Sequence, residues 1–433
     1  MPGVLGVLAA LALLIFLALR GVSILIITVV CAGIVALANG QALNAALTGA
    51  YMQGLAAFLQ QFFLLFLFGA MFGKIMGDSG AATSVAHVLS RKLGAGRALL
   101  ITVLACAILS YGGVNIFILV FTVYPLGLQL VKQANLPKRL LAGAIALGGG
   151  TFTMTALPGT PSIQNLIPAQ AFGTPATAAP ELGIPAALVM FALGYWYLAW
   201  QAKKAGRAGE GFVAGRSDGA AIKDLRPEDL PHWGLSLLPL AIVLGVIIAT
   251  RNMKPPLPWV NAALAAGCVI GVVVFYRRLK NVLAVLGEGA ANSALPIINT
   301  SAVIGFGTVV STVPAFKAFA GFFAGLHLPP LLSASVVVNV MAGLMGSASG
   351  GLRIFAQTMT PHYLGLGVEP ALLHRISAIA SGGLDSLPHN GVVITMLMVM
   401  GLTHREAYKE IFVTTVLVPL AALVVALAIA SAL

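Results

Sequence analysis

Charge is the scarcest property of this chain. Of 433 residues, only 24 are Lys or Arg and 12 are Asp or Glu, so 8% are charged while 59% are hydrophobic. Soluble domains carry about 25% charged residues. The shortage excludes a soluble protein of this length. Long apolar runs separated by short polar segments instead indicate a polytopic helical membrane protein, with no sign of alternating β-barrel strands.

Cysteine is also scarce, and the sequence lacks recognisable catalytic motifs. Cys31, Cys106 and Cys268 all lie inside apolar runs, which excludes a disulfide framework or a cysteine metal site. The chain has no phosphate-binding glycine loop, no zinc-ligand spacing and no nucleophile elbow. We therefore expect no catalytic residues, no metal and no cofactor. An intramembrane enzyme is the least favoured class, because no nucleophile is paired with a base.

The formal charge of +12 comes from short basic clusters between apolar runs. This pattern marks cytoplasmic loops and does not indicate nucleic-acid binding, for which aromatic interleaving and a basic fold motif are missing. Residues 201–231 form the one linker of changed composition, and their Lys and Arg content predicts a cytoplasmic location. We expect a first repeat at 1–200, this linker at 201–231, and a second repeat at 232–433.

The apolar runs predict the membrane elements. The first run lacks a preceding basic region, so we expect an uncleaved span and a multi-pass protein of the plasma (inner) membrane. Two elements carry a glycine pair at which each is predicted to turn, either as two crossings or as one re-entrant hairpin. Two further elements are predicted to be broken helices. The predicted elements are 3–19, 22–39, 56–76, 98–131 (turning at Gly112-Gly113), 139–170 (broken), 183–200, 233–250, 258–276, 294–312, 329–366 (turning at Gly350-Gly351), 372–402 (broken) and 410–431.

The two halves resemble each other weakly. Residues 111–117 are similar to 349–355, and each glycine pair precedes a proline-containing break. Loops next to the first pair are rich in Lys and Arg, whereas their counterparts in the second half are not. By the positive-inside rule, the halves are inverted with respect to each other.

Polar, helix-breaking segments interrupt each half at residues 155–165 and 381–391. In lipid, non-helical backbone must find other partners or line a wet cavity, so these segments predict a binding site between the repeats. The alternative for each is a purely structural kink or cap. The glycine pairs either offer backbone amides to an anion or serve close helix packing. The predicted substrate-binding residues are Gly112, Gly113, Asn115, Pro158, Gly159, Thr160, Ser162, Asn165, Gly350, Gly351, Arg353, Ser386, His389 and Asn390.

Asp385 is the leading proton-coupling residue, because charged groups within membrane segments are costly and usually functional. His389 is a proton relay or a substrate donor; alternatively, the two residues form a fixed cap. Arg353 either clamps a substrate carboxylate or extends to the membrane interface. Asn115 is its counterpart in the first half.

Residues 381–395 closely resemble the gluconate permease family of organic-acid:proton symporters, and the similarity extends across about 1–433. Residues 159–165 are also similar to the breaks of the wider ion transporter superfamily. Further matching segments lie at 68–74, 78–82, 288–293, 305–307 and 401–409.

The resemblance implies an all-helical fold of two inverted repeats, each with a re-entrant hairpin and a broken helix, working as an elevator within a homodimer. It implies import of a gluconate-like sugar acid, or of a short hydroxy acid such as 3-hydroxybutyrate or glycerate, together with protons. Residues 346–353 differ from gluconate carriers, which favours a shorter acid. The alternatives are a sodium-coupled organic anion carrier, a sodium/proton antiporter and a channel.

Overall fold

The computed structural model describes residues 2–20, 22–81, 84–85, 88, 91–92, 94–114, 116–214, 229–250, 253, 256–279, 281–315 and 328–433. Within these ranges all regular secondary structure is helical. Five helices there are long and apolar enough to cross a membrane, and shorter apolar helices accompany them. The chain is therefore a multi-pass membrane protein. The five helices are Ala45–Asp78, Pro180–Arg207, Leu257–Phe275, Val282–Thr312 and His404–Ala430.

The first half begins with two apolar helices and a long helix, followed by a helical hairpin, a broken helix and a second long helix. The elements are α1 (Pro2–Leu19), α2 (Ile24–Ala38), η1 (Ala45–Tyr51), α3 (Met52–Asp78), η2 (Ala95–Arg97), α5 (Ala98–Tyr111), α6 (Ile116–Gln133), α7 (Arg139–Gly150), η3 (Phe152–Ala156), α8 (Ile163–Phe172) and α9 (Pro180–Arg207).

The second half follows the same order, with its last helix formed by α20, η5 and α21 in succession. Its elements are α11 (Trp233–Ala249), α12 (Pro256–Phe275), α13 (Val282–Thr312), α15 (Pro330–Met345), α16 (Ala348–Thr358), α17 (Thr360–Gly365), α18 (Pro370–Ser381), α19 (Gly391–Met400), α20 (His404–Phe412), η5 (Val413–Leu417) and α21 (Val418–Ala430).

Each glycine-pair element is a hairpin of two packed helices. Helix α5 has 14 residues, so it is about 21 Å long at 1.5 Å per residue. That is shorter than the roughly 30 Å of a hydrocarbon core, whereas the 18 residues of α6 reach about 27 Å, so arm length fits both a re-entrant hairpin and two crossings. Gly113 makes the first turn with φ +93°, a conformation that favours glycine.

The predicted turn at Gly350-Gly351 is wrong by four residues. The chain turns at Gly346, which has φ +56°, and Ser347 then caps α16 by accepting a hydrogen bond from the Gly350 amide. Gly351 lies inside α16, where an added Cβ would come within 2.3 Å of the Ala342 backbone nitrogen. Its lack of a side chain serves the close packing of α16 on α15, which was the alternative interpretation of this pair.

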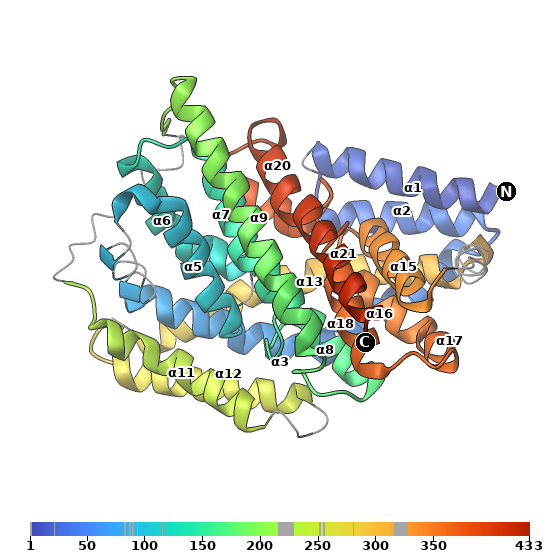
Figure 1. Cartoon of the computed structure of the whole chain (residues 1–433). Coiled ribbons are helices and arrows are strands. Elements are labelled where there is room, and N and C mark those ends of the chain that lie inside the picture. The colour runs from blue at the N-terminus through green and yellow to red at the C-terminus, as the bar shows by residue number, and fades with distance from the viewer. Residues whose placement is uncertain are drawn as a thin grey trace.

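The halves pack by matching contacts. Helix α3 packs along α13; α3 also contacts α6 and α12, just as α13 contacts α16 and α2. Likewise α6 contacts α19, and α16 contacts α8. Figure 1 shows the pair α1 and α2 at one edge of the molecule and the pair α11 and α12 at the opposite edge.

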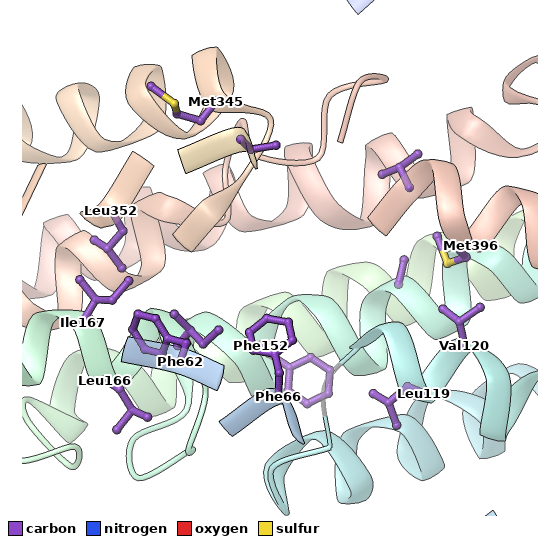
Figure 2. Close-up of a cluster of buried hydrophobic side chains, with 14 of the residues drawn as sticks. Phe62, Phe66, Leu119, Val120, Phe152, Leu166, Ile167, Met345, Leu352 and Met396 are labelled. Carbon is purple, nitrogen blue, oxygen red and sulfur yellow. The ribbon is translucent and has the colours of Figure 1, made fainter. Parts of the chain in front are cut away.

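Apolar side chains from both halves fill the region between these helices. In Figure 2, Leu352 of α16 lies over Ile167 of α8, and Met396 of α19 lies over Val120 of α6. These residues belong to one buried cluster that extends through both halves. The broken helices are therefore held in the interior, where their polar segments must be satisfied by protein or by ligand.

Candidate functional site

A cavity of about 120 Å³ lies where both hairpin tips meet both helix breaks. A single water needs about 10–15 Å³ by this measure, so the space suits a small organic molecule. Helices α3 and α13 complete the walls. The residues facing it include Leu65, Phe66, Ser110, Gly113, Val114, Ile116, Pro161, Ser162, Ile163, Gln164, Asn299, Thr300, Gly346, Ser347, Ala348, Ser349, Asp385, Ser386, Asn390, Gly391, Val392, Val393 and Thr415.

Four helices begin at this cavity. Ile116, Ile163, Ala348 and Gly391 are the first residues of α6, α8, α16 and α19, and all four line it. The N-terminal end of a helix carries partial positive charge and unpaired N–H groups, which attract anions. Among the described lining residues none is Lys or Arg. The positive potential therefore comes chiefly from backbone.

The C-terminal end of α7 reaches the same cavity, where its unpaired carbonyls carry partial negative charge. Hydroxyl groups offset this charge. Thr151 donates to the Leu147 carbonyl (2.6 Å), Thr153 to Gly148 (2.8 Å), and Ser110 to Gly149 (3.2 Å). These bonds satisfy carbonyls that a helix end leaves unpaired. The polar residues that follow Gly150 thus let the helix stop inside the molecule.

Each break is organised by one asparagine. The Asn165 amide donates to the Thr160 carbonyl (2.8 Å) and the Ala176 carbonyl (2.7 Å). The Asn390 amide donates to the Asp385 carbonyl (3.1 Å) and to Gly346 in the second hairpin tip (2.9 Å). The Asn390 side-chain oxygen also accepts from Val392 and Val393, which caps α19.

Helix α18 of the second half secures the break of the first half. Because the Asn165 amide already donates twice, its oxygen is the acceptor for His374 Nε2 at 2.9 Å. His374 Nδ1 then accepts from the Thr174 hydroxyl at 2.6 Å. The buried Arg375 guanidinium donates to the Ala176 and Ala178 carbonyls.

Asp385 is a buried carboxylate on the cavity wall, 5% exposed. Its Oδ1 accepts from the Ser386 hydroxyl at 3.0 Å. Among the described residues it has no ion pair. An unpaired carboxylate away from water is costly, and binding either a proton or a cation removes that cost.

His389 lies behind the wall and does not face the cavity. Its ring is 2% exposed and packs on Gly346, where an added Cβ would come within 2.3 Å of His389 Cδ2. Neither ring nitrogen has a hydrogen-bond partner of full geometry, although the Gly343 carbonyl is close. The ring therefore fills space beneath the second hairpin tip.

The structure brings five of the fifteen predicted site residues to the cavity. Gly113, Ser162, Asp385, Ser386 and Asn390 line it. The residues in the same segments that do not line it are Gly112, Pro158, Gly159, Thr160, Asn165, Gly350, Gly351 and His389. Asn115 lies outside the described residues.

Several residues behind the cavity hold the segments that line it. Tyr111 donates to the Pro158 carbonyl at 3.0 Å, and the Gly159 amide donates to Ala176. Gly112 packs on Leu240 of α11, where a Cβ would overlap the leucine side chain. The amides of Gly350 and Gly351 are bound to Ser347, so they are not available to a ligand.

Arg353 does not face the cavity either. It reaches from α16 to α3, where it donates to Gln61 and lies over the rings of Phe58 and Phe62. The structure therefore places Arg353 outside the central site in which it was predicted.

The cavity contains two amide side chains that are not among the predicted binding residues, although Gln164 belongs to the predicted polar segment 155–165. Gln164 and Asn299 line it, and neither makes a side-chain hydrogen bond among the described residues. Asn299 lies within the 31-residue apolar helix α13, so a polar residue at membrane depth was the available signal. Ser347 and Ser349 were likewise missed, because the second turn was placed four residues too late.

Comparison with known proteins agrees with this architecture. A model of the GntP family of permeases matches residues 2–433. The chain is 36% identical to the uncharacterized transporter YxjC of Bacillus subtilis strain 168, with 95% of each chain covered. It is also similar to an uncharacterized transporter of Haemophilus influenzae (25% identical, 74% of this chain and 73% of the other) and to an uncharacterized permease of that organism (26%, 83% and 78%).

These matches confirm the family predicted from residues 381–395 and their neighbours, and they extend over both halves of the chain. Because the family consists of permeases, the interior cavity is set in a transport protein. The chain is thus a multi-pass membrane transporter that belongs to the GntP permease family.

Proposed function

We propose that this transporter imports a small hydroxylated carboxylate together with protons. The observation that carries the proposal is the meeting of four helix N-termini at one cavity whose described lining holds one acid and no base. Such a site favours an anion through fixed backbone dipoles. A gluconate-like sugar acid or a short hydroxy acid, such as 3-hydroxybutyrate or glycerate, has this charge and size.

The substrate carboxylate binds at the start of α16. The amides of Ala348 and Ser349 occupy the first turn of that helix, where no intrahelical acceptor exists, and both residues line the cavity. The substrate hydroxyls bind the side-chain amides of Gln164 and Asn299, which offer both donors and acceptors. The adjoining apolar wall includes Phe66 and Val393.

Asp385 carries the coupled proton. When it is charged, it repels a substrate carboxylate in the same cavity, and when it is protonated that repulsion disappears. The Ser386 hydroxyl supports the charged form through its hydrogen bond. Proton and anion therefore enter as a neutral pair, which links uptake to the proton gradient.

The transport cycle we propose follows from two inverted repeats that move as an elevator within a homodimer. The repeated order of elements supports two repeats. The matching helix contacts of the two halves support a two-fold relation between them. The unequal basicity of corresponding loops supports opposite orientations. We propose residues 1–200 and 232–433 as the repeats, with a cytoplasmic linker at 201–231.

The test is uptake by purified protein in liposomes. A thermal-shift screen of about twenty organic acids first selects ligands, because binding raises apparent stability by mass action. Accumulation of the selected acid should require an inward proton gradient and stop when a protonophore collapses it. Accumulation driven by sodium alone would identify the sodium-coupled alternative. Flux that never exceeds equilibrium would identify a channel.

A further inference from the structure

Arg353 lies outside the cavity, where it contacts three side chains of α3: Gln61, Phe58 and Phe62. Arg353 lies four residues after Ser349 on α16, so both side chains share one face of the helix, one turn apart. Ser349 lines the cavity and Arg353 does not. The guanidinium therefore lies about one helical turn beyond the wall.

The guanidinium is held in place by α3. Its central carbon lies 5.7 Å from the ring centre of Phe58 and 5.9 Å from that of Phe62. Phe66, one turn after Phe62 on α3, lines the cavity. An aromatic stripe on α3 thus runs alongside Arg353 from the cavity outward, and aromatic contacts of this kind fix a cation.

Arg353 has hydrogen-bonding capacity to spare. Its one side-chain bond among the described residues goes to Gln61, and no acidic side chain there pairs with it. A guanidinium has five N–H donors and binds carboxylates bidentately. The Gln61 oxygen therefore accepts from only one of the guanidinium nitrogens, whereas a carboxylate could accept from two.

A line of amides leads outward from this point. Gln61 donates to Gln170, which is exposed near the C-terminal end of α8. Both ends of the Gln61 amide are therefore paired within the protein, its oxygen with Arg353 and its nitrogen with Gln170, so Gln61 holds the place at Arg353 that a ligand carboxylate would take.

We propose that Arg353 forms an entry site that binds the substrate carboxylate before it reaches the central cavity. In the absence of substrate, Gln61 occupies the guanidinium. The inference rests on the proposed anion transport and adds a second, separate binding site to it. It also gives a reason why this Arg, which the sequence suggests as part of the central site, is turned toward α3.

The experiment compares initial uptake rates of 3-hydroxybutyrate and gluconate in proteoliposomes of wild type, Arg353→Gln, Arg353→Lys, Gln61→Glu and Gln61→Leu. Loss of a charge-assisted bond should raise KM about tenfold or more in Arg353→Gln. The maximal rate should stay unchanged, because saturating substrate bypasses an entry site. Arg353→Lys, which keeps the charge but not the fork, should fall between.

The two Gln61 variants separate binding from packing. Gln61→Glu supplies a permanent carboxylate to Arg353 and should raise KM as Arg353→Gln does. Gln61→Leu, of similar size, removes the competing acceptor and should leave KM at or below the wild-type value. Thermal unfolding of each purified variant shows whether it is folded. Because Gln61→Glu is isosteric, it provides the test even if Arg353→Gln does not fold.

Three results have different consequences. If the wild type accumulates an acid while Arg353→Gln keeps its KM, or if Gln61→Glu and Gln61→Leu behave alike, the entry site is refuted and the transport function stands. If the wild type accumulates neither these acids nor any acid selected by the thermal-shift screen, the transport function and the entry site are refuted together. A lowered maximal rate with unchanged KM would mean that Arg353 serves the motion and not substrate capture.

Discussion

Asn165 and Asn390 make the same hydrogen bond in the two halves of the protein. Each donates its side-chain amide to the carbonyl five residues earlier, which belongs to Thr160 in one break and Asp385 in the other. The same side-chain hydrogen bond thus closes both irregular segments, although their sequences differ. Thr160 and Asp385 therefore occupy equivalent positions in the two breaks. Only the second break has an acidic residue at this position, and that residue is the proposed proton site.

Asn390→Ala should lower the free energy of unfolding by about 3 kcal/mol, because it leaves buried carbonyls and two helix-capping amides without partners. Thermal unfolding of the purified protein in detergent measures this. Asn390→Ser is the matched control, since a serine oxygen can cap α19 while its shorter side chain does not reach the Gly346 carbonyl. It should lose less stability than Asn390→Ala; equal losses would show that the cap contributes nothing.

Asp385→Asn should abolish proton-driven accumulation while the purified protein stays folded. The amide keeps the shape of the carboxyl but takes up no proton, so substrate binding is no longer linked to the gradient. Exchange of labelled for unlabelled acid across the liposome membrane should persist, because exchange needs no net proton movement. Wild-type accumulation by Asp385→Asn would exclude this residue as the coupling group.

Gly346→Ala should strongly impair folding or uptake. It places a side chain at φ +56°, which costs about 1–2 kcal/mol, and drives its Cβ into the His389 ring. The double variant Gly346→Ala/His389→Ala removes the collision and retains the backbone strain. Its thermal stability should therefore exceed that of Gly346→Ala alone, and a double variant no more stable than the single one would refute the contact.

The start of α20 offers a test of helix capping. Thr403 and Glu406 form a reciprocal capping box, in which the Thr403 hydroxyl oxygen accepts from the Glu406 amide and the Glu406 carboxylate accepts from the Thr403 amide.

Thr403→Ala should cost about 1 kcal/mol, because it removes the side-chain acceptor for the Glu406 amide. The measurement is thermal unfolding of the purified protein. Thr403→Ser, which keeps the hydroxyl acceptor, is the matched control and should lose less stability. A Thr403→Ala variant as stable as the wild type would refute the cap.

The sequence predicts most helices and both breaks, because long apolar runs and proline-rich interruptions are strong local signals, but α13 begins at Val282, twelve residues before the predicted span 294–312. It places the first hairpin turn correctly at Gly112-Gly113 but puts the second four residues too late. The reason is that glycine serves both turns and close helix contacts, and Gly351 serves the latter. Only the positive φ of Gly346, which no composition reveals, marks the true turn.

Side-chain direction accounts for the other differences. Arg353 was expected in the central site because it follows a glycine pair, yet moving the helix start to Ala348 turns its side chain toward α3. Asn299 was missed because α13 belongs to no break or hairpin, and the fold alone brings it to the cavity. Periodicity finds helices but does not say which faces of distant helices meet.

His374 and Arg375 have a consequence for how the chain could be divided. They come from the second half, yet they saturate the side chain of Asn165 and the carbonyls of Ala176 and Ala178 in the first. A fragment that ended within the central linker would lack these partners for the Asn165 oxygen and the Ala178 carbonyl, although the Ala176 carbonyl would keep its bonds from Asn165 and Gly159. Neither half is therefore self-sufficient, and two separately translated fragments would have to assemble with each other before either could mature.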